Sequence, residues 1–164
     1  MFNMKIFIGT DHAGFETKEK LKVYLTDMGH EVVDKGAFNF DKDDDYTDFI
    51  RPVAEAVAMD KEARGIIMGG SGFGEAMCAN RVHGARALVF YGPMLPKSSV
   101  DVSGRESADP YEIIKLSRMH NDANIISFGI RFITEDEMKE AIRVFLHTDF
   151  SGDERHIRRI KKLN

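Results

Sequence analysis

The chain has 164 residues, of which 43% are apolar and 30% charged, and this suits one domain with a hydrophobic core but not two domains of ordinary size. The net charge of −4 argues against a nucleic-acid-binding surface, and no apolar run approaches the roughly 18 residues of a membrane span. The N-terminus lacks the pattern of a signal peptide and Cys78 is the only cysteine, so we expect a cytoplasmic protein of one domain, residues 1–164, with neither nucleic-acid nor membrane partners.

Five short β-branched or apolar runs predict strands, at residues 5–9, 31–34, 65–68, 87–91 and 124–128. A helical pattern follows each of them. The first helix is indicated by residues at helical spacing before Gly29, which stands where a helix would stop: Leu21, Tyr24, Leu25 and Met28. The second helix follows a longer apolar stripe made of Tyr46, Phe49, Ile50, Val53, Ala54 and Val57. The third should begin near Gly74.

The later helices are predicted from their first residues. The fourth has a capping signature in Asp109-Pro110-Tyr111-Glu112, with proline at the first helical position. The fifth opens with the capping box Thr134-Glu135-Asp136-Glu137, and a basic C-terminal helix is expected at residues 153–164. The irregular stretch 92–108 follows the fourth strand, and its length is typical of a lid, a binding loop or a disordered segment.

The alternation of strands and helices predicts right-handed crossovers and a parallel sheet. The expected fold class is α/β, a three-layer doubly wound arrangement of the Rossmann or flavodoxin-like type, with five parallel strands and helices on both faces. In such folds ligands bind beyond the carboxyl ends of the strands, so the residues that follow each strand are the candidates for a site.

The segment from Gly69 to Glu75, Gly-Gly-Ser-Gly-Phe-Gly-Glu, lies between a strand and a helix. Its glycines let backbone N–H groups and a positive helix end approach an anion, although a plain strand-to-helix turn is an alternative. It fits neither the dinucleotide fingerprint nor the Walker A loop. Glu75 either complements the helix dipole or acts as the base of an aldose–ketose isomerisation, with N–H donors on the enediolate oxygen. Ser71 would then bond to the oxygens between which the hydroxyl proton moves.

Charge is unevenly spread, with an acidic run at residues 41–48 and a basic one at 155–162. In the basic run Arg155 and Arg159 share a helix face with His156 beside them, and two guanidinium groups match a phosphate dianion. Arg131, just beyond the fifth strand, could join them. The alternative is a basic helix that is simply solvated.

Two further pairs of residues lie next to strands. Asp11 and His12 follow the first strand, where Asp11 either caps a helix or helps to bind sugar hydroxyls or a ring oxygen. His120 and Asn121 precede the fifth strand, at the amino end of the sheet, and a strand of five or six residues spans roughly 17–20 Å. If His120 takes part in the chemistry, a second subunit should bring it to a shared site. The alternative is a capping or core histidine.

These motifs together resemble the ribose-5-phosphate isomerase B family, which includes the allose- and galactose-6-phosphate isomerases. The resemblance runs from about Lys5 to Lys162, apart from the segment 92–108, which looks inserted. It is carried by Asp11-His12-Ala13-Gly14, Gly69 to Glu75 with Ala79-Asn80-Arg81, His120-Asn121, and Arg155-His156 with Arg159. Because the inserted segment follows a strand at the catalytic edge, we predict that it covers or narrows the pocket.

The resemblance implies a role for each matching residue. Glu75 would be the proton-shuttling base, and the enediolate would be held by Ser71 with the backbone of Gly70, Gly72 and Gly74. Asp11 and His120 would assist ring binding and opening. The remaining substrate-binding residues would be His12, Tyr46 and Asn121, with Arg131, Arg155, His156 and Arg159 on the phosphate. It also implies no metal, no cofactor, and a homodimer or higher homo-oligomer with a shared active site.

One departure from the family pattern concerns the base. Many members carry a catalytic cysteine immediately after the third strand, where this chain has Gly69, so the chain resembles the branch that uses a glutamate at the place of Glu75. Cys78 is expected to be a buried small residue.

The resemblance therefore implies an intramolecular oxidoreductase of the pentose phosphate pathway that interconverts ribose 5-phosphate and ribulose 5-phosphate through an enediolate. Two alternatives are an isomerase of a six-carbon sugar phosphate, allose or galactose 6-phosphate, and a non-catalytic phosphosugar-binding protein. A flavodoxin-like nucleotide or flavin binder is disfavoured because the dinucleotide fingerprint fails.

Overall fold

A computed structural model describes residues 3–163 of the chain. Five parallel strands form one sheet in the order β2-β1-β3-β5-β4. Their bounds are Lys5–Thr10 for β1, Glu31–Asp34 for β2, Arg64–Gly69 for β3, Ala87–Phe90 for β4 and Ile125–Gly129 for β5. Each bound lies within one residue of the prediction, and the predicted doubly wound α/β fold is confirmed.

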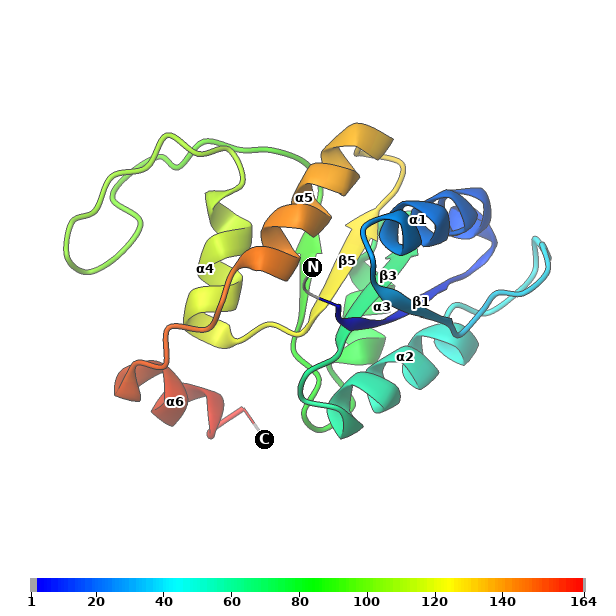
Figure 1. Ribbon diagram of the computed structural model, residues 1–164, viewed down its shortest axis with the longest axis horizontal. Coiled ribbons are helices and arrows are strands. Elements are labelled where there is room, and N and C mark those ends of the chain that lie inside the picture. Colours follow the sequence, from blue (N-terminus) through cyan, green and yellow to red (C-terminus); the bar gives the residue numbers. More distant parts are fainter. Residues whose placement is uncertain (1–2, 164) are drawn as a thin grey trace.

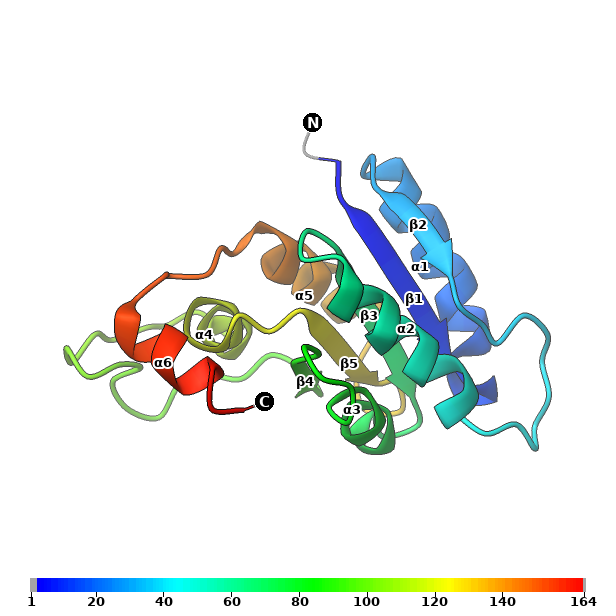
Figure 2. The same ribbon diagram turned by 90° about the horizontal axis from the view of Figure 1, so that it is seen from below.

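The helices cover both faces of this sheet (Figures 1 and 2). They are α1 (Phe15–Asp27), α2 (Thr47–Met59), α3 (Phe73–Ala79), α4 (Glu112–Asn121), α5 (Glu135–His147) and α6 (Glu154–Ile160), with a short 3₁₀ turn η1 at His12–Gly14. The apolar sides of α1, α4 and α5 pack on one face, and those of α2 and α3 pack on the other. The last helix, α6, packs on α4 beyond the sheet (Figure 2). Across residues 3–163, no helix is long and apolar enough to cross a membrane.

The apolar stripes predicted from the sequence form this core. In α2 the side chains of Ile50, Val53, Ala54 and Val57 are buried against the sheet. Burying each of the larger ones contributes roughly 1.5–3 kcal/mol of transfer free energy. A single strand between two such layers is covered on both sides, which explains why β3 and β5 read as nearly continuous apolar runs.

Two helix starts had been predicted from capping signatures, and they differ in outcome. The capping box at the start of α5 is confirmed, because the Thr134 side chain accepts from the Glu137 N–H and the Glu137 carboxylate accepts from the Thr134 N–H. The predicted start of α4 was wrong, because the helix begins at Glu112 and Pro110 therefore precedes it. Asp109 caps a turn instead, since its carboxylate accepts a hydrogen bond from the Tyr111 N–H at 2.8 Å.

Candidate active site

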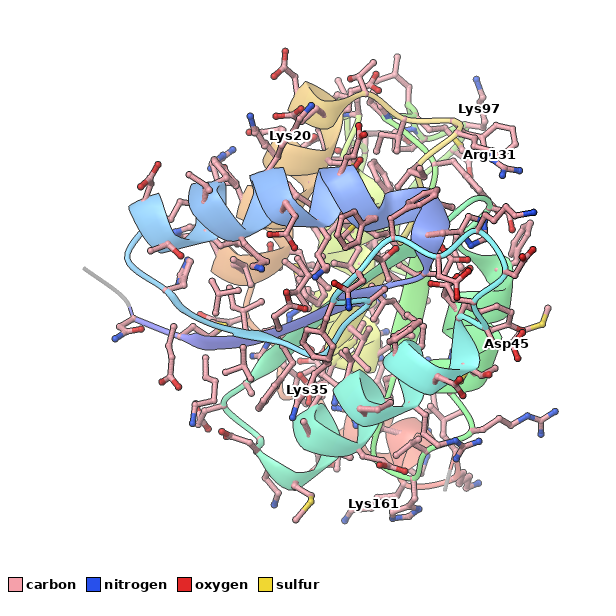
Figure 3. The ribbon with its side chains drawn as sticks, turned by 90° about the vertical axis from the view of Figure 1, so that its right-hand side faces the viewer. Lys20, Lys35, Asp45, Lys97, Arg131 and Lys161 are labelled. Carbon is pink, nitrogen blue, oxygen red and sulfur yellow. The ribbon has the colours of Figure 1, made fainter. Side chains whose placement is uncertain are left out.

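The carboxyl ends of β1, β3 and β5 meet at one edge of the sheet, because Thr10 pairs with Met68 and Gly69 pairs with Gly129. The residues that follow these strands enclose a cavity of about 390 Å³. In Figure 3 the first strand runs from left to right, and Arg131 and Asp45 both lie on the right-hand side of the view. The cavity is lined by Asp11, His12, Ala13, Tyr46, Gly70, Ser71, Gly74, Glu75, Arg131 and Phe132. Most of the predicted site residues are thus brought together by the strand register.

The glycine loop needs glycine for steric reasons at two positions. Gly72 has a φ of +75° and serves as the N-cap of α3, and the Ser127 hydroxyl donates to its carbonyl at 2.7 Å. A Cβ at Gly69 would overlap the Glu75 carboxylate. Gly69 and Glu75 therefore depend on each other, since the carboxylate occupies the space that a side chain at position 69 would need.

Glu75 lies in the first turn of α3 and is 5% exposed. Burial raises the pKa of its carboxyl group, and the negative charge of Asp11 acts in the same direction. Backbone hydrogen bonds at Glu75 and Gly72 oppose this shift. A carboxylate with a raised pKa beside backbone donors combines the properties of a general base with those of an oxyanion site.

Asp11 and His12 begin the turn after β1. The Asp11 carboxylate accepts from the Ala13 N–H at 3.0 Å, so the capping interpretation of Asp11 is confirmed, although the residue also lines the cavity. His12 contacts Asp44, a residue that we had not singled out. Three side chains here each have an atom that could bind a metal ion, and these atoms lie within 4.8 Å of one another: Asp11, His12 and Asp44. The His12 Nδ1, however, lies 2.7 Å from the Asp44 carboxylate, which is a hydrogen-bond distance. We interpret this group as a hydrogen-bonded pair beside Asp11.

Tyr46 and Arg131 complete the walls of the cavity. Tyr46 lies over the start of α3, where a Cβ at Gly74 would come within 2.9 Å of its hydroxyl. Arg131, on the turn after β5, is exposed and lies against Gly70, whose Cβ would come within 3.1 Å of the guanidinium carbon. Cys78 is buried on α3, as predicted, and burial raises the pKa of its thiol.

Five predicted residues lie elsewhere. His120 and Asn121 form the end of α4, and the others, Arg155, His156 and Arg159, lie on α6. The His120 and His156 rings are stacked with centroids 4.3 Å apart. His120 and Asn121 precede Ile125, which pairs with Gly65 at the start of β3, so they lie at the amino edge of the sheet, as expected for His120. The ring contact places His156 beside them. Arg131 does not join Arg155 and Arg159 within one chain.

The segment 92–108 does not line the cavity, contrary to our prediction. It extends away from the sheet beside α4 (Figure 1). Glu112, which is buried, holds it there by accepting hydrogen bonds from Arg105 at 2.6 Å and from the Ser107 hydroxyl at 2.8 Å. Its position after a strand predicted that the segment covers or narrows the pocket, but this ion pair directs it toward the start of α4.

Comparison with known proteins gives a consistent result. A family model described as Ribose/Galactose Isomerase matches residues 6–101 and 107–163. The chain is 36% identical over 160 residues to ribose-5-phosphate isomerase B of Mycobacterium tuberculosis H37Rv, covering 98% of this chain and 88% of that protein. It is 32% identical over 159 residues to the Escherichia coli K12 enzyme of the same name, covering 97% and 93%.

Solved structures agree in fold. Ribose 5-phosphate isomerase B from Anaplasma phagocytophilum superimposes with a TM-score of 0.83 at 32% identity, covering 100% of this chain and 99% of that one. The Mycoplasma genitalium enzyme with bound ribulose-5-phosphate gives a TM-score of 0.82 at 32% identity, covering 99% and 95%. The chain belongs to the ribose/galactose isomerase family.

Proposed function

We propose that this protein is a cytoplasmic aldose–ketose isomerase of the pentose phosphate pathway that interconverts ribose 5-phosphate and ribulose 5-phosphate. The observation that carries the proposal is the buried Glu75 carboxylate, which lies against Gly69 beside the glycine loop and lines the cavity. The names of the relatives and the ribulose-5-phosphate bound to the Mycoplasma genitalium enzyme support the same substrate.

The reaction moves one proton between carbons and one between oxygens. Glu75 removes the proton from C2 of the open-chain aldose and returns it to C1, with an enediolate between the two steps. N–H groups of residues 70–74 stabilise the enediolate oxygens, and the Ser71 hydroxyl relays the proton between O2 and O1. General base catalysis contributes roughly two to four orders of magnitude, and one oxyanion donor about 3–4 kcal/mol. Asp11 assists the opening of the sugar ring.

We further propose that the site is completed by a second subunit. Among the residues that line the cavity of one chain, Arg131 is the one lysine or arginine. The other residues expected to bind the substrate lie at the opposite edge of the sheet: Arg155, His156, Arg159, His120 and Asn121. An apolar surface on α3 and the edge strand β4 supports association: Phe73 is 52% and Met77 67% exposed, and Ala76 and Val89 line the hollow between them. Exposed apolar surface of this kind marks interfaces between proteins.

The substrate is tested by comparing kcat/KM on ribose 5-phosphate, allose 6-phosphate and galactose 6-phosphate. We expect the pentose to be preferred. An equal or reversed preference would exclude the pentose assignment, and absence of turnover on all three, with binding retained, would favour a phosphosugar-binding protein.

The shared site is tested by mixing two inactive variants, Glu75→Gln and His120→Ala. In a mixed dimer one of the two sites carries both substitutions and the other carries neither. After equal mixing and subunit exchange, about a quarter of the wild-type activity should return, since half of the dimers are mixed. If each chain has a complete site of its own, no activity returns. Each variant incubated alone under the same conditions is the control.

A further inference from the structure

The acidic run 41–48 contains one carboxylate that is not solvated. The side chain of Asp44 is 8% exposed, whereas that of its neighbour Asp43 is 78% exposed. Asp44 Oδ1 accepts from the backbone N–H of His12 at 3.1 Å and lies 2.7 Å from the His12 ring Nδ1. Its other oxygen, Oδ2, is buried and has no hydrogen-bond partner among residues 3–163. A buried, partly satisfied carboxylate costs free energy, which points to a role other than stability.

The other member of the pair faces the cavity. The His12 ring lines it together with Asp11 and Glu75, and Phe40 packs edge-on against the ring with centroids 6.4 Å apart. With Nδ1 on Asp44, the ring orientation is defined, and Nε2 lies on the side of the ring away from that carboxylate. A carboxylate at one ring nitrogen holds a proton there and favours the doubly protonated ring, in which Nε2–H is a donor.

We propose that Asp44 is a positioning residue for the substrate, which holds His12 so that its Nε2–H donates a hydrogen bond to an oxygen of the sugar phosphate. This inference rests on the proposed function. Asp44 itself does not line the cavity, so it acts through His12.

The charges that surround His12 set the direction of its titration. The hydrogen bond to Asp44 raises the pKa of His12, and the charges of Asp11 and Asp44 act in the same direction, while burial and Arg131 oppose them. Glu75 and Tyr46 are the other titratable side chains of the cavity. A raised pKa keeps His12 protonated to higher pH. If the Asp44 charge is removed, His12 should therefore lose its Nε2 proton, and with it this hydrogen-bond donor, at a lower pH.

The pair is tested in the free protein by NMR. Asp44→Asn keeps the shape of the side chain and removes its charge, and Asp43→Asn is the matched control, one residue away and exposed. The C–H resonances of the six histidines are followed between about pH 5 and pH 9, with His12 assigned from His12→Gln. We expect the pKa of His12 to fall in Asp44→Asn, because the hydrogen bond to a carboxylate is lost, and to stay unchanged in Asp43→Asn. An unchanged pKa in Asp44→Asn would overturn the proposal.

The functional part is tested by the KM for ribose 5-phosphate at two pH values. Asp44→Asn should raise KM about ten-fold at pH ~7.5, with a much smaller change in kcat, and should raise it less at pH ~6, where a larger share of His12 is protonated in the variant. Equal effects at both pH values, or the same effect in Asp43→Asn, would indicate general damage and contradict the proposal.

Failure of the proposed function gives a different result. If the wild-type protein does not convert ribose 5-phosphate, the shift of the His12 resonance on addition of that compound still reports binding without turnover. The positioning role is supported if the His12 resonance of the wild type shifts and Asp44→Asn needs a higher concentration of ribose 5-phosphate for the same shift. It is overturned if the two proteins need equal concentrations, or if the wild-type resonance does not shift.

Discussion

The two edges of the sheet differ in what they carry and in how they are held. The carboxyl edge brings Glu75 and the glycine loop together through the register of β1, β3 and β5. The amino edge carries two stacked histidines and the arginines of α6, outside the sheet. It depends on one buried guanidinium, Arg118, which joins the end of α4 to the chain before α6. The comparison shows that most groups at the carboxyl edge are placed by the strands and by the segments that follow them, whereas the chain that leads to the peripheral helix α6 is held by a buried polar anchor.

The largest effect is expected at the carboxyl edge, from Glu75→Gln. Removing the base while keeping the shape of the side chain should lower kcat about 10²- to 10⁴-fold, because the amide cannot accept the carbon-bound proton. Glu55→Gln, on the exposed side of α2, is the control and should leave kcat unchanged. Steady-state kinetics with ribose 5-phosphate measure both. Activity that survives in Glu75→Gln would mean that another group is the base.

At the amino edge, Arg118→Met should reduce stability rather than remove the chemistry. Arg118 is 2% exposed and donates to the carbonyls of Thr148 and Ala123 and to the Asp122 carboxylate. Methionine fills a similar space but removes the donor from both carbonyls and from one oxygen of Asp122, so the free energy of unfolding should fall by about 3–5 kcal/mol.

Urea unfolding monitored by circular dichroism measures this loss, with Arg143→Met as the control. Arg143 is exposed on α5 and pairs with Glu140, so its replacement should change the free energy of unfolding by less than about 1 kcal/mol. If both variants lose the same free energy of unfolding, Arg118 is not a special anchor, and the proposed contrast between the two edges is contradicted.

The sequence predicted the parts of the molecule that depend on local patterns. Strand and helix bounds follow from apolar periodicity, and the position of Glu75 in the first turn of α3 follows from the order of strand, glycine loop and helix. The burial of Asp44 could not be predicted in this way, because it lies between two other aspartates and only the path of the chain toward His12 distinguishes them. The direction of the segment 92–108 depends on the ion pair between Arg105 and Glu112, which no local pattern indicates.

The dependence of Gly69 on Glu75 gives the smallest effect and the sharpest test of the carboxyl edge. The backbone at Gly69 is outside the left-handed region, so Gly69→Ala adds no backbone strain, but the new methyl group would overlap the Glu75 carboxylate and displace it. We expect kcat to fall about 10- to 100-fold, because a misplaced base is less effective. Stability should fall too, as in other small-to-large changes at packed positions.

A double-mutant cycle on stability with Glu75→Ala separates this explanation from general damage. Without the carboxylate the methyl group has space, so Gly69→Ala should cost little further stability in the Glu75→Ala background. If the cost is the same in both backgrounds, the methyl group meets something other than Glu75, and the absence of a side chain at position 69 does not explain where the carboxylate lies.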